Sequence, residues 1–237
     1  MNDNPSTTTS LTSKLQSLDS KKSADFLLDQ LLKPKNPQDT DRFYSSWAAN
    51  YEKDIKEMEY NGGSIAAKYF LQMNFEKDSK ILDIGAGTGI IGEILQHNGY
   101  ENIDALDSNE EMLTILKQKN CYKNVIKSIV TPETKLPIND RQYDIIIMAG
   151  VFCPGHIDYR SLAQIIRITK SGGFICWSMG NPKIYADRDE LYNDGNFERY
   201  IALLCDKMKW LSVLGYPIVV ENFVKNLPGF FYAMQVV

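Results

Sequence analysis

The sequence predicts an α/β fold, a largely parallel sheet flanked by helices and closed by an antiparallel C-terminal hairpin. Apolar runs of strand length alternate with segments of helical periodicity, which is typical of βαβ units. The run at residues 143–148 (YDIIIM) is apolar almost throughout, as in strands covered by helices on both faces. Two runs rich in Val and Phe end the chain on either side of a Pro-Gly turn, which indicates a hairpin.

The elements follow from these patterns in chain order. Strands are expected at residues 81–84, 103–106, 125–130, 143–148, 174–177, 218–224 and 230–237. Helices are expected at residues 89–98, 108–120, 159–169 and, as one long segment, 187–210.

The composition indicates one globular domain with an N-terminal extension. The chain has 237 residues, of which 43% are hydrophobic and 24% charged. Its first 23 residues include ten Ser or Thr and few apolar side chains, too few to offset the entropy lost on ordering. We therefore expect a disordered leader at residues 1–40 and a folded domain at residues 41–237.

Charge and cysteine usage exclude several function classes. The formal charge is −4 and no run of five Lys or Arg occurs, so we expect no nucleic-acid partner. No apolar stretch approaches the roughly 18 residues that a membrane span needs. The four cysteines form no CxxC pair and only two histidines are present, which predicts reduced thiols and no metal site. These features are typical of a cytoplasmic protein.

A glycine-rich loop follows the first predicted strand. Gly85, Gly87 and Gly89 alternate with other residues, and a helix follows. Glycine permits a tight turn and lets the backbone approach a ligand, although the same loop also occurs as a plain strand-to-helix connection. Asp83 stands just before the first glycine, where a carboxylate is poorly placed beside a pyrophosphate. It suits a cationic ligand better, such as the ammonium and sulfonium of S-adenosylmethionine.

A second carboxylate ends the second predicted strand. Asp107 lies at the same edge of the sheet as the glycine loop, and a carboxylate there can accept both hydroxyls of a ribose. Alternatively, Asp107 is the N-cap of the helix that follows.

Over residues 41–237 the chain resembles the class I S-adenosylmethionine-dependent methyltransferases. The resemblance is carried by ILDIGAGTG, ALDSNEEML, LPINDRQYDIIIM and ITKSGGFICW, in that order. It implies a seven-stranded Rossmann-like sheet whose last strand is antiparallel, with S-adenosyl-L-methionine as the cofactor. The cofactor-binding residues that it implies are Tyr51, Asp83, Gly85, Ala86, Gly87, Asp107, Ser108, Met112, Ile129, Val130 and Ala149.

The resemblance also distributes these residues over the cofactor. Gly85 and Gly87 would pack under the methionine portion and Asp107 would bind the ribose. Ser108 and Met112 would lie near the adenine. Many members carry an acid after the third strand to bind the adenine amino group, but here the stretch is KSIVT. Backbone groups of Ile129 or Val130 would have to replace that acid.

Two further segments are similar to a subgroup that includes the methyltransferase-like protein of the Williams–Beuren syndrome region. They are FYSSWAANYEKD at residues 43–54 and GVFCPGHI at residues 150–157. Tyr44, Trp47 and Tyr51 are spaced to share one helical face. That face either covers the cofactor, with Tyr51 touching it, or is simply the buried side of a lid helix.

The loop after the fourth strand contains the candidate for acid–base chemistry. His156 is the side chain there whose ordinary pKa lies near neutrality. It either deprotonates a methyl acceptor or is a core or helix-start histidine. Methyl transfer mainly requires alignment and exclusion of water, and we expect a small-molecule acceptor. The alternatives are a cofactor-binding adaptor without turnover and an NAD(P)-dependent oxidoreductase.

Overall fold

The computed structural model describes residues 26, 29–34, 36–215 and 217–237. Most of the expected leader lies outside these residues. The strands are β1 (Ile81–Ile84), β2 (Ile103–Asp107), β3 (Asn124–Lys127), β4 (Tyr143–Ala149), β5 (Thr169–Gly180), β6 (Trp210–Ser212), β7 (Ile218–Val224) and β8 (Leu227–Val236). The α-helices are α3 (Pro37–Trp47), α4 (Tyr51–Glu57), α5 (Gly62–Gln72), α6 (Ile90–His97), α7 (Glu110–Gln118), α8 (Leu162–Ile168) and α9 (Asn196–Asp206). Short 3-10 helices are η1 (Ala48–Asn50), η2 (Tyr159–Ser161), η3 (Pro182–Ile184) and η4 (Glu190–Gly195).

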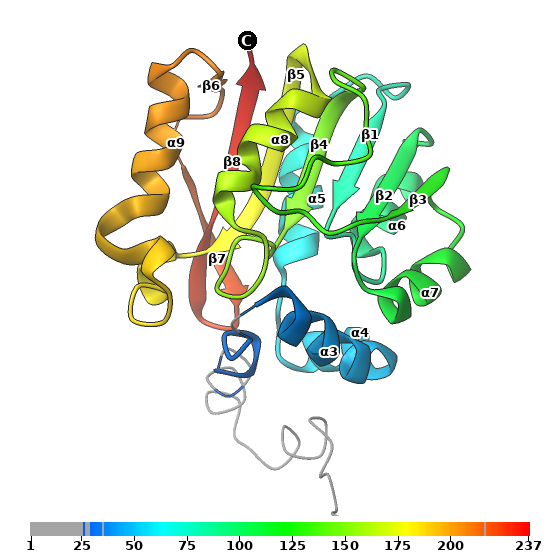
Figure 1. The fold of residues 1–237 in the computed structure, drawn as a ribbon. Coiled ribbons are helices and arrows are strands. Elements are labelled where there is room, and N and C mark those ends of the chain that lie inside the picture. Colours follow the sequence, from blue (N-terminus) through cyan, green and yellow to red (C-terminus); the bar gives the residue numbers. More distant parts are fainter. Residues whose placement is uncertain (1–25, 27–28, 35, 216) are drawn as a thin grey trace, which may run out of the picture.

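The strands form one mixed sheet in the order β3-β2-β1-β4-β5-β8-β6. The strands from β3 to β5 along this order are parallel, and β8 runs antiparallel to β5. The predicted α/β fold with an antiparallel last strand is therefore confirmed. Helices cover both faces of the sheet (Figure 1).

The sheet has eight strands and not the expected seven. Both β6 and β7 pair with β8, β6 near its carboxyl end and β7 near its amino end. The chain leaves the sheet between Ser212 and Ile218, in a stretch where Gly215 has a left-handed φ of 77°. The edge position next to β8 is thus filled by two short strands in place of one.

Alternate residues of the central strands pack against opposite helical layers. Leu82 and Ile84 of β1 belong to the large core cluster that includes residues of α8 and α9. Ile81 of the same strand packs with residues of α5 and α6 on the other face. This two-sided burial confirms the interpretation of the continuous apolar runs.

The expected long helix at residues 187–210 is wrong. The 3-10 helix η4 occupies its beginning, and α9 starts only after Asp194 and Gly195, whose φ angles of 50° and 72° are left-handed. Such angles cannot continue a right-handed helix, so the chain turns there before α9. The end of the segment is extended, because Trp210 already begins β6.

Helices α3 and α4, which we call the lid, lie across the carboxyl end of the parallel strands (Figure 1). Helix α3 is capped by Asn36, whose side chain accepts the backbone N–H of Asp39. Position 41, the expected start of the domain, falls inside α3, and Leu32 already belongs to the core with an exposed fraction of 7%. Among the described helices, none has the length and apolar character required to cross a lipid bilayer.

Candidate functional site

A cavity opens at the carboxyl ends of β1, β2 and β4, beneath α3 and α4. It encloses about 870 Å³ of space, part of it open to solvent, which is the size of a typical small-molecule site. The predicted site residues that line it are Tyr51, Gly85, Gly87, Asp107, Ser108, Met112, Ile129, Val130, Ala149 and His156. The tertiary structure therefore gathers residues from five separate segments around one space, which we call the main cavity.

The glycine loop forms one wall of the main cavity. Gly85 has a φ of 69°, and a Cβ there would lie 2.4 Å from the Val151 side chain. Gly87 has a φ of 54° and faces open space, since a Cβ there would meet nothing within 4 Å. Gly85 is thus required by packing, whereas Gly87 leaves room for a ligand to approach the backbone. Gly89 caps α6 and packs near Leu116.

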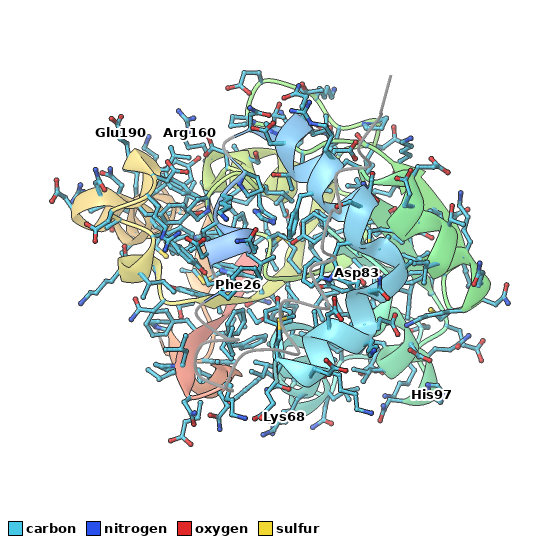
Figure 2. All side chains as sticks on the ribbon, turned by 90° about the horizontal axis from the view of Figure 1, so that it is seen from below. Phe26, Lys68, Asp83, His97, Arg160 and Glu190 are labelled. Carbon is cyan, nitrogen blue, oxygen red and sulfur yellow. The ribbon has the colours of Figure 1, made fainter. Side chains whose placement is uncertain are left out.

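Asp83 lies behind the glycine loop and does not line the main cavity. Its side chain is fully buried, and the Tyr122 hydroxyl donates to its Oδ2 at 2.7 Å. Viewed from the lid side, Asp83 is near the middle of the molecule, whereas His97 and Glu190 lie at the rim (Figure 2). Burial raises the pKa of Asp83 to about 7. Asp83 therefore supports the loop from inside the protein.

Asp107 connects the glycine loop with the loop that follows β2. Its Oδ2 accepts the backbone N–H of Gly87 at 2.8 Å, and its Oδ1 accepts that of Asn109 at 2.9 Å. Burial raises the pKa of this carboxyl, while the backbone N–H groups oppose the shift. The alternative that Asp107 caps the next helix is wrong, because the side chain of Asn109 accepts the N–H of Met112 and caps α7.

Asn109 also holds the lid, a role that was not predicted from the sequence. Its Nδ2 donates to the backbone oxygen and the Oδ1 of Asp41, at 3.0 and 2.9 Å, and to Ser45 Oγ at 2.8 Å. Both of these partners belong to α3. An Asn followed by two Glu at a helix start is an N-cap signal, which could have identified its cap role but not its contact with the lid.

The aromatic residues of the lid have two different roles: some line the site, and one packs on the buried side of the lid. Tyr44 and Tyr51 line the main cavity. Trp47 is only 3% exposed, packs with Ile55, and donates its Nε1–H to Asp54 at 2.8 Å. The three residues also do not lie on one continuous helix, because η1 separates α3 from α4.

His156 is hydrogen-bonded on both ring nitrogens. Its Nδ1 is 3.0 Å from the carbonyl oxygen of Pro154, and its Nε2 is 2.9 Å from the Tyr44 hydroxyl. A carbonyl only accepts, so we assign the proton to Nδ1, and Nε2 then accepts from Tyr44. Burial lowers the pKa of His156, which favours this neutral form. It is not a helix-start residue, because Asp158 caps η2.

Two further hollows adjoin the main cavity. The loop hollow contains Ala86 and is lined by Tyr51, Ile55, Tyr60, Gly63, Ser64, Gly85, Ala86, Gly87, Thr88, Ile90, Ile91 and Ala149. The aromatic chamber is lined by Leu31, Leu32, Tyr44, Trp47, Tyr51, Ile55, Tyr60, Gly150, Cys153, His156, Tyr185, Phe223 and Val224. Tyr51 and Tyr60 line all three spaces, so each space borders on these two side chains.

Tyr60 and Gly150 were not predicted as site residues. Gly150 has a φ of 66°, and a Cβ there would lie 2.1 Å from the Tyr60 hydroxyl oxygen. The glycine thus allows Tyr60 to approach the backbone at the border of the three spaces. The position of Gly150 in the loop after β4 could have identified it as a site residue, but no local pattern marks Tyr60.

The charged side chains that line the main cavity are acidic. Asp41 and Asp107 are its charged side chains, and no Lys or Arg occurs among the described residues that line it. Such a lining favours a cationic ligand over a diphosphate.

Comparisons with known proteins agree with this architecture. A family described as "Methyltransferase domain" matches residues 82–177. Methyltransferase-like protein 27 of Homo sapiens is 24% identical over 196 residues, which cover 78% of this chain and 79% of that protein. The ubiquinone/menaquinone biosynthesis C-methyltransferase of Burkholderia orbicola is 30% identical over 136 residues, 55% of each chain, so the match spans about half the length of that relative.

A solved structure shows the same fold. The SAM-dependent methyltransferase from Aquifex aeolicus aligns with a TM-score of 0.55 and 22% identity, over 81% of this chain and 98% of that one. The glycine loop, the antiparallel last strand and these likenesses lead to one conclusion. Residues 82–177 match a methyltransferase domain, and the fold is the one seen in class I S-adenosylmethionine-dependent methyltransferases, which this chain resembles.

Proposed function

We propose that this protein transfers the methyl group of S-adenosylmethionine to a small-molecule acceptor by in-line displacement. The observation that carries the proposal is that three spaces border on Tyr51 and Tyr60. One space is acidic and suits a cationic nucleoside, one lies under the glycine loop, and the third is an aromatic chamber. A donor and an acceptor can thus approach each other beside these two side chains.

The lining residues fit the parts of the cofactor. Asp107 would accept the ribose hydroxyls, and Ser108, Met112, Ile129 and Val130 would surround the adenine. The methionine end would occupy the loop hollow, beside Tyr51 and Ala86. Thr88 lines that hollow, and its hydroxyl is buried without a hydrogen-bond partner among the described residues. Buried hydroxyls normally have partners, so a polar ligand group there would complete this one.

The bound cofactor supplies a methyl group that is already activated for transfer by its positively charged sulfur. The protein then has to align the acceptor and exclude water. The lid would limit the access of water, because Tyr44 and Tyr51 line the main cavity and Asn109 holds α3 in place. The side chains around the aromatic chamber align the acceptor. Asp83 contributes by supporting the loop from behind.

The size of the aromatic chamber supports a small acceptor. Its empty space is about 510 Å³, and the lid and residues 31–32 form part of its wall. A polymer segment or a folded protein would have to displace those elements to reach Tyr60.

The proposal is tested by measuring binding and turnover together. Calorimetry should show binding of S-adenosylhomocysteine by the full chain and loss of at least tenfold in affinity in Asp107→Ala. Asp140→Ala is the matched control, since Asp140 is an exposed carboxylate that pairs with Arg167 and does not line the main cavity. Incubation with radiolabelled S-adenosylmethionine and metabolite extract should then yield a methylated small molecule. Intact binding with no methylated product would instead favour an adaptor without turnover.

A further inference from the structure

We propose that the acceptor is an uncharged molecule methylated on a hydroxyl oxygen, and that Tyr44 and His156 together remove the proton of that hydroxyl in the aromatic chamber. This inference rests on the proposed function and specifies the substrate class of the same site.

The lining of the aromatic chamber is aromatic and aliphatic. Among the described residues that line it there is no Asp, Glu, Lys or Arg. Transfer of an unpaired charge into such surroundings is strongly unfavourable. Burial raises the pKa values of Tyr44, Tyr60 and Tyr185, so their hydroxyls stay protonated and provide no compensating charge. An acceptor that is neutral in water therefore fits the chamber, and a carboxylate or an ammonium does not.

The hydrogen bonds of Tyr44 point to a hydroxyl as the reacting group. The Tyr44 hydroxyl donates its proton to His156 Nε2, and the His156 Nδ1–H is held by the Pro154 carbonyl. The Tyr44 oxygen therefore keeps lone pairs that can accept a hydrogen bond. Tyr44 lines both the main cavity and the chamber, so an acceptor hydroxyl near Tyr51 and Tyr60 can donate to it.

The proton and charge balance of the step is complete. The acceptor oxygen forms a bond to the methyl carbon while the carbon–sulfur bond breaks and its electron pair stays on sulfur. The acceptor proton moves to the Tyr44 oxygen, and the proton of Tyr44 moves to His156 Nε2. One positive charge, on sulfonium before the step, resides on imidazolium after it. The Pro154 carbonyl accepts from that imidazolium at Nδ1, and solvent removes the extra proton after the product leaves.

The titratable side chains around His156 form three groups. Those that line the main cavity with it include Asp41 and Asp107. Those that share the aromatic chamber with it are Tyr44, Tyr51, Tyr60, Tyr185 and Cys153. A further hollow, bordered by residues 130–133 and by Leu191 and Tyr192, is lined by His156 together with Glu133, Asp158, Asp189, Tyr192 and Cys153.

The first experiment measures binding of three matched rings to the full chain saturated with S-adenosylhomocysteine. The probes are 4-ethylphenol, which is neutral, 4-hydroxyphenylacetate, which is anionic, and tyramine, which is cationic. We expect 4-ethylphenol to bind at least tenfold more tightly than either charged ring. Equal or tighter binding of a charged ring, or no binding of 4-ethylphenol, would overturn the proposal. Methylation of some other metabolite by the same preparation would leave the proposed function standing.

The second experiment tests the proton path through the pH dependence of methyl transfer to 4-ethylphenol. Tyr44→Phe and His156→Asn should each lower kcat at least a hundredfold at pH 7. Their rates should rise about tenfold per pH unit toward the phenol pKa of about 10, because a phenolate needs no base, whereas the wild-type rate should change little. Tyr69→Phe removes the hydroxyl of a tyrosine that lines none of the three spaces and stacks on Phe231, and it should keep the wild-type profile. Variants that stay equally slow at pH 10, or a control that behaves like Tyr44→Phe, would contradict the assigned roles.

Discussion

The hydrogen bonds of Asn109 predict how firmly the lid is closed. Replacing Asn109 by Asp keeps a side-chain oxygen that can cap α7 through Met112 N–H. It also replaces the Nδ2 donor by an acceptor oxygen that faces Asp41. In the wild-type protein, Nδ2 lies 2.9 Å from Asp41 Oδ1. The substitution therefore separates the lid contact from the cap.

The expected magnitude follows from the bonds that are lost. An amide group has two N–H donors, and each net hydrogen bond contributes about 0.5–1.5 kcal/mol. Repulsion between two carboxyl groups adds to this loss. We expect closure of α3 to be weakened by about 2–4 kcal/mol, which raises its opening constant by roughly 30-fold to 1000-fold. The Tyr44–His156 bond and the Thr40–Gly155 bond at 2.5 Å remain to hold the helix.

Hydrogen–deuterium exchange checks this expectation. Amides of α3 should exchange at least about 30-fold faster in Asn109→Asp, while those of β1 and β4 stay protected, and S-adenosylhomocysteine should dissociate faster. Asn139→Asp makes the same charge change at an exposed loop position and should leave α3 unaffected. Wild-type exchange of α3 in a folded Asn109→Asp protein would refute the idea that Asn109 holds the lid.

Three more predictions concern the loops below the lid. Asp107→Ala should weaken S-adenosylhomocysteine binding by at least tenfold in calorimetry, because a bond to a charged group contributes about 1.5–3 kcal/mol. Gly85→Ala should lower the free energy of unfolding by about 1–3 kcal/mol in urea, since the left-handed φ and the Val151 side chain both oppose a Cβ; Val151→Ala in the same chain should recover part of the loss. For Asp83, a folded pKa raised to about 7 means that stability falls as pH rises from about 4 to 7. The stability of Asp83→Asn relative to wild type should therefore increase over that range, and a constant difference between the two proteins would argue against the raised pKa.

Local patterns determined the parallel strands and the glycine loop well. Residues 81–84 and 143–148 are strands as expected, because burial on both faces leaves a run that is apolar at all but one position. The segment at residues 187–210 was misjudged, because helical periodicity does not register the left-handed turn at Asp194 and Gly195. The divided edge strand was missed for a related reason: β6 has only three residues, too few for a pattern.

The candidate site was likewise only partly predictable from the sequence. Its residues from the glycine loop and β2 were predictable, because the carboxyl ends of parallel strands meet at one edge of a sheet. The placement of Asp83 behind the loop was not predictable, because alternation along a strand does not show which hydroxyl contacts a buried carboxylate. In the structure, the Tyr122 hydroxyl contacts Asp83. Nothing local indicated that residues 31–32 would form part of the wall of the aromatic chamber.

The sequence by itself determined the fold class, the cofactor family and the segments that border the site, because these depend on periodicity and on short motifs. Only the tertiary structure decided which side chains face each other: Asn109 with α3, His156 with Tyr44, and Tyr60 with Gly150. Those contacts join residues far apart in the chain, and their geometry is fixed by how the lid packs on the sheet. The proposed proton path rests on the contact between His156 and Tyr44, and the neutral character of the acceptor rests on the uncharged lining of the aromatic chamber.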